Sequence, residues 1–128
     1  MYKRQEDGVG GDNHHCYRAT CYETTKLLVE KINIDPDKTI TSFQSRLDSK
    51  WVKPFSDKVL EEFAAEGVKK VLVVSPSFTG DCLETIIEIG DEYKELFTEK
   101  GGQTLDYVPS LNSNDNWVKC IVNIIRGV

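Results

Sequence analysis

The sequence has no cluster of basic residues and no long apolar run. Lys and Arg number 16 against 21 Asp and Glu among 128 residues, so the formal net charge is −5. A surface for nucleic acid needs grouped Lys and Arg side chains to meet the phosphates. A membrane-spanning helix needs roughly 20 apolar residues in succession. The composition therefore argues against nucleic acid as a partner and predicts no transmembrane segment.

The N-terminal segment lacks the apolar centre of a secretion signal. Residues 1–16 are polar, and we expect them to form a poorly ordered leader before one domain over residues 17–128. Four cysteines are too few for a secreted fold held together by disulfides. Both observations predict a cytoplasmic protein.

One pair of cysteines is close in the sequence. Cys16 and Cys21 have a C-x4-C spacing, which differs from the C-x2-C spacing of a zinc knuckle. His14 and His15 stand beside this pair and do not reliably complete a ligand set. We therefore favour the loosely packed start of a helix here over a metal site.

Apolar periodicity and turn signals predict an alternation of helices and strands. Helices are expected from Tyr17 to a stop before Asp35, from Ser56 to Gly67, over 81–97 and after Ser113 or Asn114, and strands over 39–45, 71–75 and 104–108. This alternation predicts an α/β fold with three layers, in which helices flank a parallel sheet. The apolar strand over 71–75 is expected to be central and covered on both faces. The last helix is expected to turn Trp117, Ile121, Ile124 and Ile125 inward.

In an open parallel sheet, ligands bind beyond the carboxyl ends of the strands. The candidate loops are therefore those that follow Ser45 and Ser75. The second loop leads to Asp81 at the start of a helix, where an ordinary Asp or Thr cap is favoured over an anion site. A sheet of three strands is small for this architecture, which suggests a fragment of a longer protein.

Glu84, Glu88 and Glu92 recur at every fourth position of the third predicted helix. This spacing places three carboxylates along one helix face, where like charges destabilise the helix. Carboxylate oxygens are ligands for divalent metals, so the row is a candidate metal path. The alternative is a solvated acidic face. Gly90 in the middle of this helix predicts irregular geometry there.

The loop after the first predicted strand combines cations with an aromatic side chain. Gln44, Ser45 and Arg46 end that strand, and Trp51 follows between two lysines. Such a set suits a flat apolar ligand that carries carboxylates, because the indole ring stacks and Arg46 meets the acid groups. The alternative is that Trp51 packs in the core of the domain.

Together these segments resemble ferrochelatase, the family that inserts ferrous iron into protoporphyrin IX. The matching strings are C-Y-E-T-T at 21–25, S-F-Q-S-R at 42–46, W-V-K-P at 51–54, V-L-V-V at 71–74 and F-T-G-D-C-L-E-T at 78–85, and the match continues through D-E-Y at 91–93 to Leu111-Asn112. The resemblance implies a Rossmann-like chelatase half-domain, which is the C-terminal part of the whole protein. It also implies ferrous iron as substrate, no organic cofactor, and protoporphyrin IX, a divalent metal and the missing N-terminal half as partners.

The resemblance assigns roles to individual residues. It implies that Glu84 is the active-site glutamate, which faces the porphyrin and delivers metal or removes a proton, with Asp81 beside it as a second catalytic residue. Glu84, Glu88 and Glu92 correspond to the acidic line proposed as a metal path. The candidates for porphyrin binding are Phe78, Trp51, Gln44, Ser45 and Arg46. A poorly solvated pocket is expected to raise the pKa of the active-site carboxylate into the range of a base.

Two departures from the family's pattern bear on activity. Cys82 stands where many members carry His, and the Ser-x-His-Gly string that holds the family's catalytic histidine is absent. We do not transfer that role to His14 or His15. The chain without its N-terminal half is therefore expected to be inactive. The alternatives are another type II chelatase, for a different tetrapyrrole, and a stand-alone module that binds a tetrapyrrole or a metal.

Overall fold

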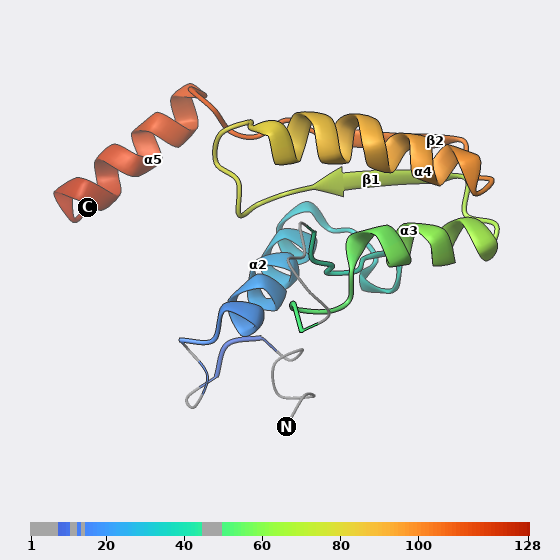
Figure 1. Cartoon of the computed structure of the whole chain (residues 1–128). Helices are drawn as coiled ribbons and strands as arrows, with labels where there is room; N and C mark the ends of the chain where they lie inside the picture. The colour runs from blue at the N-terminus through green and yellow to red at the C-terminus, as the bar shows by residue number, and fades with distance from the viewer. Residues whose placement is uncertain (1–7, 11–12, 14, 45–49) are drawn as a thin grey trace. The chain divides into compact units, whose positions relative to one another are not determined.

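The computed structural model describes residues 8–10, 13, 15–44 and 50–128. The chain divides into two compact units, Met1–Val59 and Leu60–Val128. The elements follow one another in the order α2, η1, α3, β1, η2, α4, β2 and α5. Figure 1 colours the described chain along this order, from blue in α2 to red in α5. Two candidate ligand residues, Ser45 and Arg46, lie outside the described residues, as does His14.

The first unit contains the first predicted helix. Helix α2 (Tyr17–Ile32) begins at the predicted residue, ends shortly before the predicted stop at Asp35, and buries Ala19. It ends at Asn33, which has a φ of 56° and donates its backbone N–H to Val29 O. Asparagine tolerates this left-handed conformation better than most residues, which makes it a suitable helix end. The prediction of this helix is confirmed.

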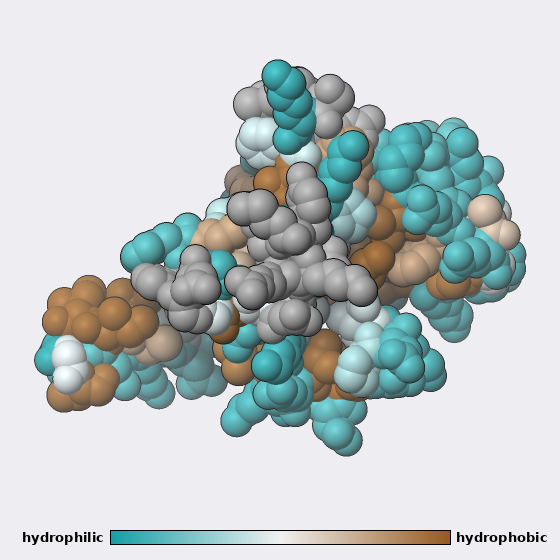
Figure 2. All heavy atoms as spheres, turned by 90° about the horizontal axis from the view of Figure 1, so that it is seen from below, coloured by the Kyte–Doolittle hydropathy of each residue, from teal (hydrophilic) through white to brown (hydrophobic). Residues whose placement is uncertain are grey.

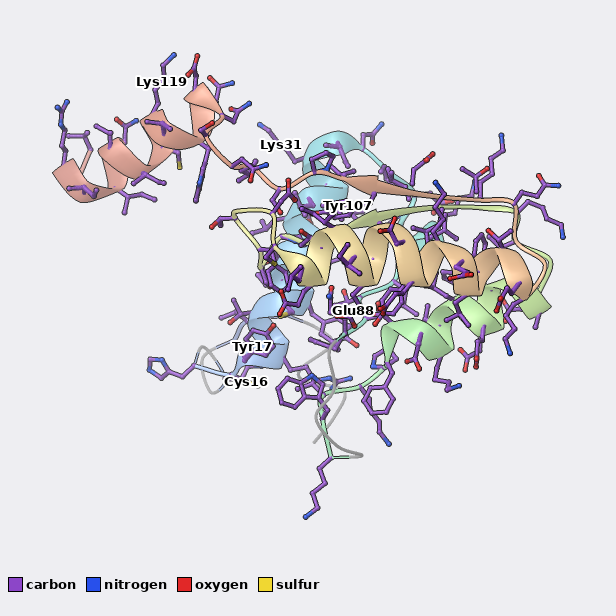
Figure 3. All side chains as sticks on the ribbon, turned by 45° about the horizontal axis from the view of Figure 1, so that its top comes forward. Cys16, Tyr17, Lys31, Glu88, Tyr107 and Lys119 are labelled. Atoms are coloured by element: carbon purple, nitrogen blue, oxygen red, sulfur yellow. The ribbon has the colours of Figure 1, made fainter. Side chains whose placement is uncertain are left out.

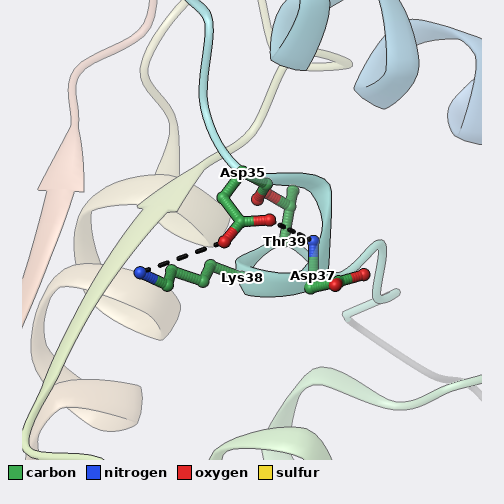
Figure 4. A network of polar contacts seen from close by, with 4 residues as sticks. All are labelled: Asp35, Asp37, Lys38 and Thr39. Atoms are coloured by element: carbon green, nitrogen blue, oxygen red, sulfur yellow. Dashed lines mark hydrogen bonds and ion pairs between the residues drawn. The ribbon is translucent and has the colours of Figure 1, made fainter.

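A short 3₁₀ turn, η1 (Pro36–Lys38), follows α2, as Figure 4 shows. The Asp35 carboxylate accepts a hydrogen bond from Asp37 N at 3.1 Å, and Lys38 Nζ lies 4.0 Å from the same carboxylate. Thr39 Oγ1 donates to the backbone oxygen of Asp35 at 3.4 Å. An exposed ion pair of this kind contributes little, so the cap on Asp37 N holds the turn.

The strand predicted over 39–45 is wrong for its described part. Phe43 forms an isolated parallel bridge with Phe55, in which Phe43 N donates to Pro54 O and Ser56 N donates to Phe43 O, each at 2.9 Å. The hydroxyl of the neighbouring Thr41 bonds to a side chain of α2, not to a strand. β-branched residues favour an extended backbone, but a strand also needs a partner along its length, and the described residues provide only one bridge.

The second unit is built around a parallel sheet. Helix α3 (Ser56–Ala65) leads into it and is followed by Gly67, which has a φ of 86° and marks the predicted helix end. Strands β1 (Lys70–Val74) and β2 (Thr104–Val108) pair in parallel. The core consists of buried side chains from α3, β2 and the two helices between the strands: Leu60, Ala64, Ile89, Phe97 and Leu105. The predicted class, a parallel sheet flanked by helices in a Rossmann-like half-domain, is confirmed.

The two faces of this sheet differ. Val71 and Val73 of β1 pack against the core. Leu72, 65% exposed, and Val74, 53% exposed, alternate with them and point to the opposite face. The prediction of a central strand covered on both faces is therefore wrong for the described residues, where the sheet has two strands. Strand β1 carries apolar side chains on both faces, and among the described residues the helices of this unit cover one of these faces.

The helix predicted over 81–97 has two parts. Residues Glu84–Tyr93 form the π-helix η2, and Lys94–Glu99 form helix α4. Gly90 lies inside the π-helical part, so the predicted irregularity is confirmed. Beyond α4, a Cβ atom at Gly102 would overlap the ring of Phe97, and glycine there lets the chain pass close to the core.

The last helix, α5 (Asp115–Arg126), has well-formed ends. Asn114 Oδ1 accepts from Asn116 N at 3.0 Å, which confirms the predicted cap. The prediction that its apolar residues point inward is wrong: Ile124 is 70% exposed, Ile125 is 78% exposed, and Ile121 is exposed as well. Figure 2 shows these apolar atoms as the brown group at the left of the view. Periodicity predicts the helix, but not what packs against it.

Candidate functional site

The two loops that follow the strands leave the same end of the sheet. Val74 and Val108, the last residues of β1 and β2, pair in register. The segments 75–83 and 109–114 therefore start side by side. Figure 3 labels Tyr107 at this end of the sheet, near the start of η2. The sequence singles out the first of these loops and not the second.

Asp81 connects the two loops. Its Oδ1 accepts from Ser110 N and from Tyr107 OH, each at 3.0 Å, and its Oδ2 accepts from Asn112 Nδ2 at 2.7 Å. These hydrogen bonds, Asn112 first and the Ser110 backbone next, hold the pKa of Asp81 well below its ordinary value, against the opposing effect of desolvation. A carboxylate bound in this way is a poor proton donor, so the geometry gives Asp81 a part in holding the loops together.

Thr85 is fully buried just inside η2. Its Oγ1 lies 3.2 Å from Asp81 Oδ1, accepts from Cys82 N at 3.0 Å and lies 3.1 Å from Cys82 O. A side chain that reaches back to the amide before the helix is one half of a capping box. The first turn of η2 is thus attached to Asp81 through Thr85.

Glu84 is the first residue of η2, and its side chain is exposed. A hydrogen bond from the Cys82 side chain and a second from its own backbone N–H lower the pKa of Glu84, while desolvation and the charge of Glu88 act in the opposite direction. The expected rise of this pKa is wrong, because a rise needs a poorly solvated pocket and this carboxylate lies in solvent beside local donors. At neutral pH Glu84 is an anion that suits a divalent cation.

Glu88 and Glu92 follow along η2. Tyr93 OH donates to Glu88 Oε1 at 2.8 Å, across the five-residue separation that a π-helical pattern brings together, and Figure 3 labels Glu88. Glu92 is exposed. Within residues 8–10, 13, 15–44 and 50–128, no group of three or more His, Cys, Asp or Glu side chains is arranged to hold a metal ion. The row therefore offers successive carboxylates, and the metal path stays a prediction.

Comparison with known proteins identifies the family. The family model described as Ferrochelatase matches residues 3–127. The chain belongs to the ferrochelatase family. A ferrochelatase of Coxiella burnetii (strain Dugway 5J108-111) is 42% identical over 119 residues, which are 92% of this chain and 34% of that protein.

Other ferrochelatases match to a similar extent. That of Ectopseudomonas mendocina (strain ymp) is 46% identical over 107 residues, or 83% of this chain and 32% of that protein. That of Shewanella denitrificans (strain OS217) is 40% identical over 122 residues, or 91% of this chain and 35% of that protein. The chain spans about a third of the length of these ferrochelatases. In the part of the chain that the structure describes, no helix has the length and apolar character to cross a membrane.

The candidates for porphyrin binding belong to both units. Phe78 lies half-buried in the loop after β1, where its N–H donates to Ser75 O at 3.0 Å. Gln44, half-buried, and Trp51 belong to the Met1–Val59 unit. Trp51 is 39% exposed, so it is not a core residue of this structure, and the interpretation as core is wrong.

Three residues of the site come from the loop after β2 and its approach: Tyr107, Ser110 and Asn112. Sequence reasoning missed them as site residues, because none of the three carries a charge or belongs to an apolar pattern. The available signal is the string Y-x-x-S-x-N, which starts inside a predicted strand and ends beyond it. Polar side chains in that position face the neighbouring loop of a parallel sheet.

Proposed function

We propose that this chain is the C-terminal third of a ferrochelatase that inserts ferrous iron into protoporphyrin IX to form protohaem, a step of haem biosynthesis. The observation that carries the proposal is an ionised Glu84 at the start of a π-helix, at the carboxyl end of the parallel strands, in a chain of this family. Ferrous iron is the substrate, and no organic cofactor takes part.

Glu84 coordinates the entering metal ion. Iron takes the place of both pyrrole N–H protons of the macrocycle, so these protons leave as the iron–nitrogen bonds form. A carboxylate with a lowered pKa is a weak base and a good ligand for a divalent cation, which favours a metal-binding role for Glu84. The two protons then pass one after the other through another base to solvent, and the resemblance implies that this base is the family's catalytic histidine, in the Ser-x-His-Gly string that this sequence lacks.

Glu88 and Glu92 bring the metal towards Glu84. Both are on η2, and the hydrogen bond from Tyr93 OH holds one oxygen of Glu88 in a fixed direction. A carboxylate that is already oriented loses less side-chain entropy when it binds a cation. Successive single carboxylates pass an ion along because none of them holds it tightly.

The aromatic candidates contact the porphyrin. A flat macrocycle stacks favourably on an aromatic side chain, and each unit offers one candidate, Trp51 in the first and Phe78 in the second. Gln44 and Ser45 border the ligand, and Arg46 meets a propionate with a charge-assisted hydrogen bond.

The first experiment uses the 128-residue chain alone. With zinc or ferrous iron and protoporphyrin it should give no metallation above the uncatalysed rate, because the chain has no Ser-x-His-Gly string to accept protons. The measurement is porphyrin absorbance over time. Turnover at an enzyme-like rate would contradict the proposal that the chain is an incomplete enzyme.

The second experiment restores the missing part. In a chimera, this chain replaces the 119-residue segment of the Coxiella burnetii ferrochelatase that it matches. The chimera should metallate protoporphyrin, whereas the remainder of that protein without any such segment should not. A folded chimera that binds porphyrin and does not metallate it would contradict the proposal. Metallation of a different tetrapyrrole only would favour the related chelatase.

A further inference from the structure

Asn112 connects the loop after β2 to the loop after β1. Its Oδ1 accepts from Asp81 N at 2.9 Å, and its Nδ2 donates to Asp81 Oδ2 at 2.7 Å. Its backbone N–H donates to Thr79 O at 2.8 Å. Nδ2 also lies 3.0 Å from Ser110 O, within its own loop. One amide side chain therefore binds both the main chain and the side chain of Asp81.

Asparagine suits this position for two reasons. The φ of Asn112 is 49°, the left-handed region in which Asn is one of the few tolerated residues other than Gly. Its amide also carries an acceptor and a donor side by side, and both are used towards the same residue. Asp in its place keeps the shape and the acceptor but sets a second carboxylate against Asp81 Oδ2. Gly keeps the backbone conformation but removes both bonds.

The contacts continue from Asp81 to the active helix. Asp81 Oδ1 bonds to the buried Thr85 Oγ1 at 3.2 Å, and Thr85 Oγ1 accepts from Cys82 N at 3.0 Å. Thr85 N and Ile86 N both donate to Cys82 O. Glu84 lies inside this turn, so its backbone cannot move without disturbing these bonds. A series of hydrogen bonds therefore links Asn112 to the turn that carries Glu84, by way of Asp81 and Thr85.

We propose that Asn112 is a positioning residue. Its hydrogen bonds to Asp81 fix the first turn of η2, which carries Glu84. These hydrogen bonds lie within the Leu60–Val128 unit. Their consequence for metal insertion rests on the proposed role of Glu84, whereas the effect on the helix start does not. Asn112 touches neither metal nor porphyrin in this account, and it acts by holding the backbone that presents the carboxylate.

The direct test is amide hydrogen exchange, followed by NMR on the 128-residue chain. Asn112→Asp should accelerate exchange at residues 84–86 by about tenfold or more and shift the Glu84 amide signal, while amides of β1 and α4 keep their protection. Asn123→Asp, the same chemical change on an exposed residue of α5, is the matched control and should have neither effect.

A reciprocal exchange tests the specific contact. Asp81→Asn combined with Asn112→Asp restores a donor facing an acceptor across the two loops, because the donor now comes from position 81. The double variant should recover about half or more of the lost protection on a logarithmic scale, which a simple loss of stability does not do. Unchanged exchange at 84–86 in Asn112→Asp, or no recovery in the double variant, would overturn the proposal.

The chimera with the Coxiella burnetii protein supplies the catalytic readout. Asn112→Asp should lower kcat by about 100-fold with little change in KM for porphyrin, because Glu84 is misplaced and the macrocycle contacts remain. Faster exchange at 84–86 with an unchanged kcat would support the effect of Asn112 on the start of η2. It would contradict the proposed role of Glu84 in metal insertion. A rise in KM with kcat unchanged would overturn a positioning role for Asn112 towards Glu84.

Discussion

Two helical segments follow the carboxyl ends of the strands and differ in regularity and in packing. The first consists of η2 and α4, and the second is α5. The first is irregular, carries like charges along one face, and buries Ile89 and Phe97 in the core. The second has a capped start, a left-handed glycine at its end and no buried residue. Regular local structure does not predict tertiary packing here, and irregular structure occurs where polar contacts and the core fix the helix.

The largest expected effect contrasts one side chain from each helix. Phe97 is fully buried, so Phe97→Ala should destabilise the fold by about 3–5 kcal/mol. Ile124 is 70% exposed, so Ile124→Ala should change the free energy of unfolding by less than about 0.5 kcal/mol. Urea unfolding followed by circular dichroism measures both. Equal losses would mean that α5 packs as tightly as α4.

The second contrast is between the starts of the two helices. Thr85→Val should destabilise the second unit by about 1–3 kcal/mol, because the fully buried Thr85 hydroxyl is the acceptor of the half-buried Cys82 N–H and valine offers none. Asn114→Ala removes the cap of α5 and should reduce helical content there without lowering the urea midpoint of the core. A midpoint unchanged by Thr85→Val would show that the polar contacts at η2 do not matter.

The smallest expected effect is a dependence on pH. The pKa of Asp81 is lower in the folded chain than its ordinary value of 3.8. At a pH between the folded-state pKa and the ordinary pKa, the unfolded state therefore binds more protons than the folded state. The stability that Asp81 contributes is present above pH 3.8 and is lost as the pH falls further. Asp81→Asn should therefore flatten the acid limb of stability against pH, compared with the exposed Asp106→Asn as control. An identical acid limb in the parent and Asp81→Asn would contradict this contribution.

The sequence predicts the elements of this molecule better than their neighbours. Helix α2, strands β1 and β2 and the cap at Asn114 follow from periodicity, β-branched runs and turn residues, which are local signals. The strand predicted around Phe43, the central position of β1 and the inward face of α5 depend on partners that a local pattern does not contain. The apolar pattern indicates which residues avoid water, but it does not indicate which elements pack against them.

The candidate site divides in the same way. Glu84 and Asp81 are found because carboxylates at regular spacing and a family motif identify them. Asn112 escapes, because an uncharged residue 31 positions from Asp81 gains its importance only when two parallel strands bring their loops together. The direction of the pKa shift of Glu84 is not predicted from the sequence either, because it depends on solvent exposure and on the Cys82 side chain beside it.

We propose that Glu84 coordinates the metal in a ferrochelatase to which this chain contributes the C-terminal third. The most direct measurement is steady-state zinc insertion by the chimera carrying Glu84→Gln, with Glu99→Gln, an exposed acidic residue of α4, as control. We predict a fall in kcat of about 100-fold or more, an almost unchanged KM for porphyrin, and an unaffected control. A kcat equal to that of the parent chimera would contradict the account.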